Sequence, residues 1–325
     1  MYRFAPATVS GRAVRSTDLC FALLFASVLL TAPGQVVGAV NDAPPPPWPS
    51  IGLALGSGGA GGLAHIAMLQ VFDDLSIRPD RIAGTSIGAV IGALYAAGLS
   101  AQQIRDIFAE FGGSSLDALS RLADPDAGLT FADLVEIDID NGGLIDSGGF
   151  LDFLAEKIEA RTFAELEIPL EIVATDYWSG QTVVLKEGDL FAAIGASMAV
   201  PGLFAPVPRG EQLLIDGGTS DPLPFDLLEG RHALIVAIDV SGSRRDGGQD
   251  EVEWNRLVFS TFEIMQQSII AARMRAWKPD IYIKPDTSGV RLLHFNRIDR
   301  ILEQAGPAAR TLKQQLLEAR KAMTE

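Results

Sequence analysis

The sequence is poor in cysteine and histidine, with one Cys and three His among 325 residues. A disulfide framework needs paired cysteines and a structural zinc site needs several Cys or His ligands, so neither can be the basis of the fold. Basic residues are also scarce, because 26 Lys and Arg stand against 41 Asp and Glu, which gives a net charge of −15. A chain of this charge repels phosphate backbones, so no nucleic acid partner is expected.

Neither disorder nor a bundle of membrane-spanning helices fits the composition. Charged residues make up 21% of the chain and hydrophobic residues 48%, which is enough apolar surface for one sizeable core. Because the net charge is negative, adsorption to an anionic bilayer is unfavourable, and contact with lipid would need a local apolar surface. The composition therefore predicts a folded domain that is compatible with transient membrane contact only.

The first 39 residues have the pattern of a secretory signal peptide. Three arginines precede an apolar stretch from Leu19 to Ala32, and Val37-Gly38-Ala39 is a small-residue site that a signal peptidase could cut. The stretch is shorter than the ~20 residues that a spanning helix needs, so an uncleaved anchor is the less favoured alternative. We therefore expect an exported protein, periplasmic or secreted, with a signal peptide at 1–39, a proline-rich linker at 40–50 and one domain at 51–325.

Short apolar runs alternate with helical periodicity throughout the expected domain. Ile51–Leu55 and Arg81–Gly84 are predicted strands. Each is followed by a predicted helix, Leu63–Leu75 and Ile87–Ala97. This alternation predicts an α/β fold with a mostly parallel sheet covered by helices on both faces. The irregular segment Gly112–Gly149 is a candidate lid or pocket wall. Further strands are predicted at Leu170–Thr175, Thr182–Leu185, Leu213–Ile215, Ala233–Asp239 and Asp280–Ile283, and long helices near Val252–Trp277 and Arg297–Ala322.

Ser86 is the candidate nucleophile. It is the central residue of Gly84-Thr-Ser-Ile-Gly88, which matches G-x-S-x-G between a predicted strand and a predicted helix. A serine held in a strained strand-to-helix turn needs neighbours without Cβ, and the helix N-terminus favours developing negative charge. The alternative is a tight turn that merely packs against the next helix. Ser197 and Ser57 are weaker candidates, because Ser197 lacks the second glycine and Ser57 lies inside a glycine run that suits a different role.

The glycine-rich loop Gly56–Gly62 joins the first predicted strand to the first predicted helix, so its backbone N–H groups can converge on an anion. The loop also satisfies the G-x-G-x-x-G spacing of a dinucleotide site, but that fingerprint requires an acidic residue after the next strand, where Ser86 stands instead. We therefore interpret the loop as an oxyanion hole, with donors from Gly58 and Gly59.

An activated serine needs a base, and each of the three histidines is a poor candidate. His65 lies among apolar residues of a helix, His232 precedes a core strand, and His294 lies in an apolar run. Asp216 differs, since it ends a strand and precedes two glycines, which allow close approach of a partner. A turn-forming aspartate is the alternative interpretation. A carboxylate base would titrate well below a histidine unless burial raises its pKa.

Four motifs in order resemble the bacterial patatin-like phospholipases and the related lipase domain of neuropathy target esterase. The motifs are Leu53–Ile66, Gly84–Gly88, Ala196–Pro206 and Ile215–Gly218. The resemblance implies a three-layer α/β/α patatin-like fold and hydrolysis of lipid acyl esters by a Ser-Asp dyad without a catalytic histidine. It implies that Ser86 is the nucleophile, Asp216 the base, and Gly58 and Gly59 the oxyanion hole. The family usually has Arg or Lys at the position of Gly61.

The sequence thus predicts a serine acyl-hydrolase that cleaves carboxylic ester bonds of a phospholipid or lysophospholipid. Its expected partner is the lipid or ester substrate, and no metal or organic cofactor is expected. Two alternatives remain open. The first is a conventional Ser-His-Asp esterase that uses His232 or His294. The second is a non-catalytic lipid-binding protein whose oxyanion loop is degenerate at Gly61.

Export has a direct test. If the first 39 residues are a cleaved signal peptide, the protein recovered from outside the cytoplasm begins near Val40, which N-terminal sequencing or intact mass will measure. A soluble cytoplasmic protein that retains Met1 would contradict this prediction.

Overall fold

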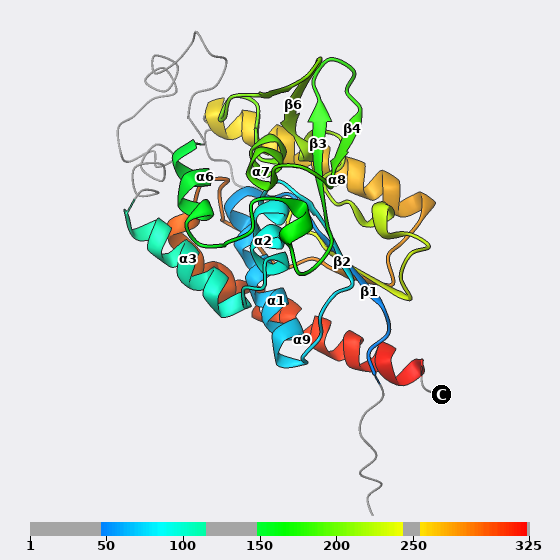
Figure 1. Cartoon of the computed structure of the whole chain (residues 1–325). Helices are drawn as coiled ribbons and strands as arrows, with labels where there is room; N and C mark the ends of the chain where they lie inside the picture. The colour runs from blue at the N-terminus through cyan, green and yellow to red at the C-terminus, as the bar shows by residue number, and fades with distance from the viewer. Residues whose placement is uncertain (1–46, 115–147, 243–253, 324–325) are drawn as a thin grey trace, which may run out of the picture. The chain divides into compact units, whose positions relative to one another are not determined.

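A computed structural model of the chain describes residues 47–114, 148–242 and 254–323 (Figure 1). The predicted signal peptide at 1–39, most of the predicted linker at 40–50 and most of the predicted lid at Gly112–Gly149 lie outside the described residues. Residues 46–325 form one of two units into which the chain divides, and it is the unit described below. In the described ranges, the structure contains no helix that is both long and apolar enough to cross a membrane.

The described strands form one mixed, mostly parallel sheet with the order β5-β6-β3-β2-β1-β7-β8, and β4 also pairs with β3. Strands β8, β7, β1, β2 and β3 run parallel, whereas β4, β5 and β6 join the sheet by antiparallel pairs. The predicted parallel sheet is therefore confirmed, with an antiparallel extension at one end. The strands are β1 Ile51–Leu55, β2 Arg81–Thr85, β3 Leu170–Asp176, β4 Thr182–Leu185, β5 Val207–Arg209, β6 Gln212–Asp216, β7 Leu234–Ile238 and β8 Ile281–Ile283.

Helices cover both faces of this sheet, as the apolar pattern predicts. Side chains alternate along β1, so that Leu53 belongs to the large core cluster under most of the helices and Ala54 to a smaller cluster on the opposite face. Helix α8 contributes Ile270 to that smaller cluster. The helices are α1 Ala64–Asp74, α2 Ile87–Ala96, α3 Ala101–Ser114, α6 Gly148–Ala155, α7 Leu190–Ser197, α8 Trp254–Ala276 and α9 Ile298–Ala322. Short 3₁₀ turns are η1 Gly59–Leu63, η4 Phe163–Glu165, η5 Gly217–Thr219, η6 Phe225–Leu228 and η7 Phe295–Arg297.

Four of the described helices and strands were absent from the sequence prediction: α3, α6, α7 and β5. Helix α7 begins where the Asp189 carboxylate accepts the N–H of Ala192 at 2.8 Å, an N-cap that the sequence carries locally. Strand β5 is only three residues long and includes Pro208, so its place in the sheet depends on pairing with β6 rather than on propensity.

The two edges of β3 determine where the candidate site residues lie. Residue Val173 pairs with Thr85 at the end of β2, and Ala174 pairs with Asp216 at the end of β6. Strand β4 pairs with the same two β3 residues, so it occupies the other edge of β3. Strands β2 and β6 therefore run toward each other along one edge of β3, and their last residues meet. Figure 1 shows β6 and β4 on opposite sides of β3.

Replacement of Phe72 by alanine tests the packing of α1, where the ring is fully buried. Loss of this ring leaves a cavity in the main cluster, so Phe72→Ala should lower the free energy of unfolding by about 3–5 kcal/mol in denaturant titration. Gln70, on the exposed side of the same helix, is the matched control. A Gln70→Ala change should stay within about 0.5 kcal/mol, and equal losses for the two variants would contradict this packing.

Candidate functional site

Ser86 is the N-cap of α2 and has φ 56° and ψ −124°, a strained conformation for a residue with a side chain. The backbone around it packs too closely for larger residues. A Cβ at Gly84 would lie 2.7 Å from the Gly88 carbonyl oxygen, and one at Gly88 would lie 2.2 Å from that of Leu55. Both glycines of the G-x-S-x-G pattern are therefore required by contact, and the predicted elbow is present.

Ser197 stabilises the elbow through two hydrogen bonds. Its hydroxyl accepts the N–H of Ser86 at 2.8 Å and donates to the carbonyl of Val173 at 2.6 Å. From the sequence, Ser197 is only a weak nucleophile candidate, and nothing near it in the chain predicts this positioning contact. It depends on α7 and β3, which are distant in sequence from the elbow, so no local pattern could have revealed it.

Asp216 ends β6 and is completely buried. Its Oδ1 accepts the N–H of Gly218 at 2.6 Å, while Oδ2 has no hydrogen-bond partner in the described part of the chain. The Ser86 hydroxyl is close enough to affect the Asp216 carboxyl, although it does not complete a well-aligned hydrogen bond. Catalytic hydrogen bonds are often loose before substrate binds, so this geometry is compatible with a nucleophile and base.

Burial raises the pKa of Asp216 to about 7, although the nearby Ser86 hydroxyl and the hydrogen bond from Gly218 oppose the shift. A carboxylate base has a pKa below that of a histidine unless burial raises it, and burial has this effect on Asp216. An activity that needs ionised Asp216 would therefore rise with pH near 7. A pH profile alone consequently cannot separate this base from a histidine.

Two adjacent N–H groups remain available in the glycine-rich loop. Ser57 donates its N–H to Pro222, and Ala60 donates to the Leu292 carbonyl at 2.7 Å. Between them, the N–H groups of Gly58 and Gly59 make no hydrogen bond within the described ranges, and both residues are partly exposed. A Cβ at Gly58 would lie 2.0 Å from the Val240 carbonyl oxygen, so glycine is required there. The loop thus presents two donors, as an oxyanion hole requires.

A buried contact connects this loop to α8 and to the segment after Asp216. Gln266 is 2% exposed and donates its Nε2–H to the Ser57 hydroxyl at 2.8 Å. Gly218 lies against the same atoms, since a Cβ there would be 2.3 Å from Gln266 Nε2 and 2.6 Å from Ser57 Oγ. The sequence does not point to Gln266, because no local motif distinguishes this glutamine from the other residues of a long helix.

An ion pair between buried Asp239 and the more exposed Lys284 supports the other side of the loop, at the ends of β7 and β8. Lys284 donates from Nζ to Asp239 Oδ2 at 2.9 Å, and the Tyr282 hydroxyl donates to the same oxygen at 2.5 Å. Burial by itself raises the pKa of Asp239. The Lys284 charge and the hydrogen bonds together lower this pKa by more than burial raises it, so the net shift is downward. This ionised cluster is adjacent to Val240, whose carbonyl packs on Gly58.

None of the three histidines is placed to act as a base toward Ser86. His65 is fully buried, donates Nε2–H to the Gly56 carbonyl at 2.9 Å, and has a pKa that burial lowers to about 4. His294 accepts the N–H of Arg291 on Nδ1, so its neutral ring carries the proton on Nε2 and cannot accept another there. His232 precedes β7 and lies beside Gly52 at the amino end of the sheet, opposite Ser86.

Gly61, where the resemblance leads one to expect Arg or Lys, has ordinary space around it. A Cβ there would lie 3.4 Å from Thr287 and 3.6 Å from the Val240 carbonyl oxygen. The missing side chain therefore leaves the path of the loop intact in this structure. Among residues 47–114, 148–242 and 254–323, no cluster of His, Cys, Asp or Glu could hold a metal ion.

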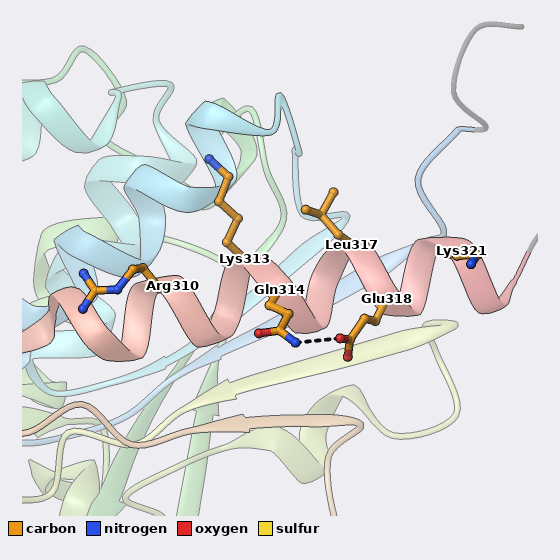
Figure 2. A pocket seen from close by; sticks show the side chains of 6 residues that line it. All are labelled: Arg310, Lys313, Gln314, Leu317, Glu318 and Lys321. Carbon is orange, nitrogen blue, oxygen red and sulfur yellow. Dashed lines mark hydrogen bonds between the residues drawn. The ribbon is translucent and has the colours of Figure 1, made fainter. Parts of the chain in front are cut away.

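A shallow hollow of about 450 Å³ lies on the outer surface of α9, and Figure 2 shows the six side chains that line it. It lies near the amino end of the sheet, whereas Ser86 follows the carboxyl end of β2. Arg320 near the end of α9 lies over the Trp48 ring, 4.3 Å from its centroid, and Trp48 precedes the start of β1. The hollow is therefore separate from the candidate site.

Fold and site together define an α/β protein with a serine elbow at the carboxyl edge of its sheet. The chain belongs to the patatin-like phospholipase family, whose family model matches residues 53–229. It is 36% identical over 228 residues to an uncharacterised NTE family protein of Mycobacterium tuberculosis. The aligned residues cover 68% of this chain and 59% of that protein. It is 30% identical over 207 residues to patatin-like phospholipase domain-containing protein 6 of Mus musculus. That alignment covers 63% of this chain and 14% of the mouse protein.

A solved structure also aligns with the chain. VipD from Legionella pneumophila is 15% identical with a TM-score of 0.45, over 83% of this chain and 67% of VipD. The chain spans less than two thirds of the length of the curated relatives named above. Family membership confirms the patatin fold expected from the motifs and is consistent with hydrolysis of lipid esters.

The buried carboxyl of Asp216 should make stability depend on pH. Its pKa is about 7 in the folded chain against an ordinary value of 3.8, so it favours folding when protonated. That contribution is complete below about pH 4 and is lost as pH rises through about 7. Asp216→Asn should therefore be more stable than the parent protein at pH 8, by a few kcal/mol, and the difference should shrink at pH 4.

Denaturant unfolding at the two pH values measures this effect. Asp106→Asn, which alters an exposed carboxylate on α3, is the control and should show no comparable trend. An Asp216→Asn variant with the same stability difference at both pH values would show that burial does not raise the pKa of Asp216.

Proposed function

We propose that this protein is a serine acyl-hydrolase that cleaves carboxylic esters of phospholipids or lysophospholipids, with Ser86 as nucleophile and Asp216 as base. The observation that carries the proposal is the approach of the Ser86 hydroxyl to a buried carboxyl with an unpartnered Oδ2. The two available N–H donors of Gly58 and Gly59 support it. Membership of the patatin-like phospholipase family supports the class of substrate.

In the first half of the reaction, the ionised Asp216 removes the hydroxyl proton of Ser86 as Ser86 Oγ attacks the ester carbonyl. The carbonyl oxygen becomes an oxyanion, which the N–H groups of Gly58 and Gly59 stabilise. Collapse of this intermediate breaks the carbon–oxygen bond of the ester. Asp216 returns the proton to the leaving alkoxide, and the acyl group remains on Ser86.

In the second half, water replaces the alcohol. Asp216 accepts a proton from water as the water oxygen attacks the acyl carbonyl, and the same two N–H donors stabilise the second oxyanion. Collapse releases the fatty acid, and the proton on Asp216 passes to Ser86 Oγ. Burial makes Asp216 a better general base, because a carboxylate with a pKa of about 7 binds a proton more strongly than an exposed carboxylate does.

The structure weighs against the Ser-His-Asp alternative, because the histidines named for it are occupied or distant. His294 uses Nδ1 to accept a backbone N–H, and His232 lies at the amino end of the sheet. The non-catalytic alternative rests on Gly61, yet the donors of Gly58 and Gly59 do not depend on a cation there. Export remains part of the proposal, since the residues that predict it lie outside those the structure describes.

Labelling and turnover test the dyad. Ser86→Ala should abolish both hydrolysis of a soluble p-nitrophenyl ester and labelling by a fluorophosphonate. Asp216→Asn should lower kcat/KM by at least ~10²–10⁴, because it removes the proton acceptor. Ser268→Ala is the control, since it changes an exposed serine on α8 and should retain both activities.

Substitution of the histidines distinguishes the proposed Ser-Asp dyad from a Ser-His-Asp triad. Glutamine at His65, His232 or His294 should lower activity only as far as it lowers stability, measured on the same preparations. An enzyme that survives Asp216→Asn but is inactivated by one of these changes would overturn the proposed base. A folded parent protein with neither labelling nor turnover would support the non-catalytic alternative.

A further inference from the structure

The two most exposed large apolar side chains in the described ranges are adjacent aromatics. Tyr177 is 56% exposed and Trp178 is 69% exposed. Their rings contact each other edge to face, with centroids 4.9 Å apart. Exposed aromatic rings of this kind are enriched where proteins meet partners or the polar boundary of a bilayer.

The turn that carries these rings is held by several hydrogen bonds. Asp176, the last residue of β3, accepts the Ser179 hydroxyl on Oδ2 at 2.6 Å, and its carbonyl accepts the N–H of Gly180 at 2.8 Å. Tyr177 donates its own N–H to the Leu213 carbonyl of the neighbouring strand at 2.8 Å. Gly180 has φ +70°, a left-handed conformation that suits glycine. The aromatic rings are therefore displayed by a well-defined turn.

This turn lies at the same end of the sheet as the candidate site. Strand β3 runs parallel to β2, and its residue Val173 is level with Thr85, which precedes Ser86. Strand β3 continues three residues beyond that level to Asp176, on the order of 10 Å, and Trp178 follows in the turn. Figure 1 shows the β3–β4 turn at one extremity of the sheet.

We propose that Tyr177 and Trp178 form a docking tip that inserts into the interface of a zwitterionic lipid surface. This inference rests on the proposed function, since a lipid ester hydrolase must reach substrate packed in an aggregate. Their amphipathic rings suit the headgroup boundary, where an apolar body is buried and a polar edge stays hydrated. A lipid surface bound by the tip would lie at the end of the sheet where Ser86 lies.

Charge selects a zwitterionic surface over an anionic one. The net charge of the chain is −15, and the nearby β5–β6 turn carries one cation, Arg209, and one anion, Glu211. No cluster of basic residues in the described ranges accompanies the tip, so attraction to phosphatidylserine is not expected. The affinity for lipid comes from the aromatic rings themselves.

A competing surface for lipid is the hollow on α9. Figure 2 shows Arg310, Lys313 and Lys321 around Leu317, which is 44% exposed. Glu318 also lines the hollow and Lys313 pairs with Asp74 at 3.5 Å, but three cations beside an exposed leucine still make this the surface that would favour anionic lipid. It lies at the opposite end of the sheet from Ser86, so a surface bound there would be remote from the candidate site. Leu317→Ala is therefore the matched control for loss of an exposed apolar side chain.

The experiment measures co-sedimentation of the protein with phosphatidylcholine vesicles, with and without added phosphatidylserine. The double change Tyr177→Ala and Trp178→Ala should lower the partition coefficient roughly tenfold or more, because most of the apolar area of the tip is lost. Leu317→Ala should leave binding unchanged. Trp178→Phe should retain most binding while it removes a blue shift of tryptophan emission caused by vesicles.

Activity on a soluble p-nitrophenyl ester separates this inference from the proposed function. The double variant should retain kcat/KM on that ester within about twofold, since the rings do not touch the reacting groups. Vesicle binding that depends on the tip in a protein without esterase activity would keep the inference and overturn the proposed function. Unchanged binding of the double variant, or binding that requires phosphatidylserine and is lost in Leu317→Ala, would overturn the inference.

Discussion

The candidate site depends on one edge of β3, where two strands that run in opposite directions end side by side. Strand β2 runs parallel to β3 and is followed by Ser86. Strand β6 runs antiparallel to β3 along the same edge and ends at Asp216. Strand β4 occupies the opposite edge and leaves this one free for both. A further hydrogen bond connects the end of β2 to the segment after β6, because Thr85 donates its hydroxyl to the Asp221 carbonyl at 2.9 Å. Residues 130 positions apart are thus brought together by the sheet.

Close contacts of backbone carbonyls explain why glycine recurs around the site. The carbonyls of Leu55, Val173 and Val240 occupy the positions that a Cβ would take at Gly88, Gly217 and Gly58, respectively. The loop, the elbow and the strand end at Asp216 are therefore packed through their backbones. This packing also removes water from Asp216, which raises the pKa of its carboxyl and makes its ionised form costly to stability.

The ends of the sheet have different characters. The carboxyl end of the parallel strands carries the elbow, the available loop donors and the exposed aromatic turn after β3. The amino end carries an ion cluster in which the buried Glu171 carboxylate accepts from Arg81 and Arg231. Removal of a buried charge partner is destabilising, so this cluster is best explained by stability rather than by chemistry. The candidate site thus lies at the carboxyl end of the parallel strands, and the Glu171 ion cluster lies at their amino end.

Local sequence alone was sufficient to determine the strands and helices around the elbow, the identities of Ser86 and Asp216 as candidates, and the mostly parallel sheet. These features follow from apolar periodicity and from glycines at fixed offsets, which act over a few residues. Sequence could not determine that Ser197 supports the elbow, that Gln266 reaches Ser57, or that β5 joins the sheet, because each depends on elements distant along the chain. Only the tertiary structure decided the protonation behaviour of Asp216, since its pKa is raised by burial, and burial is a property of the packed chain.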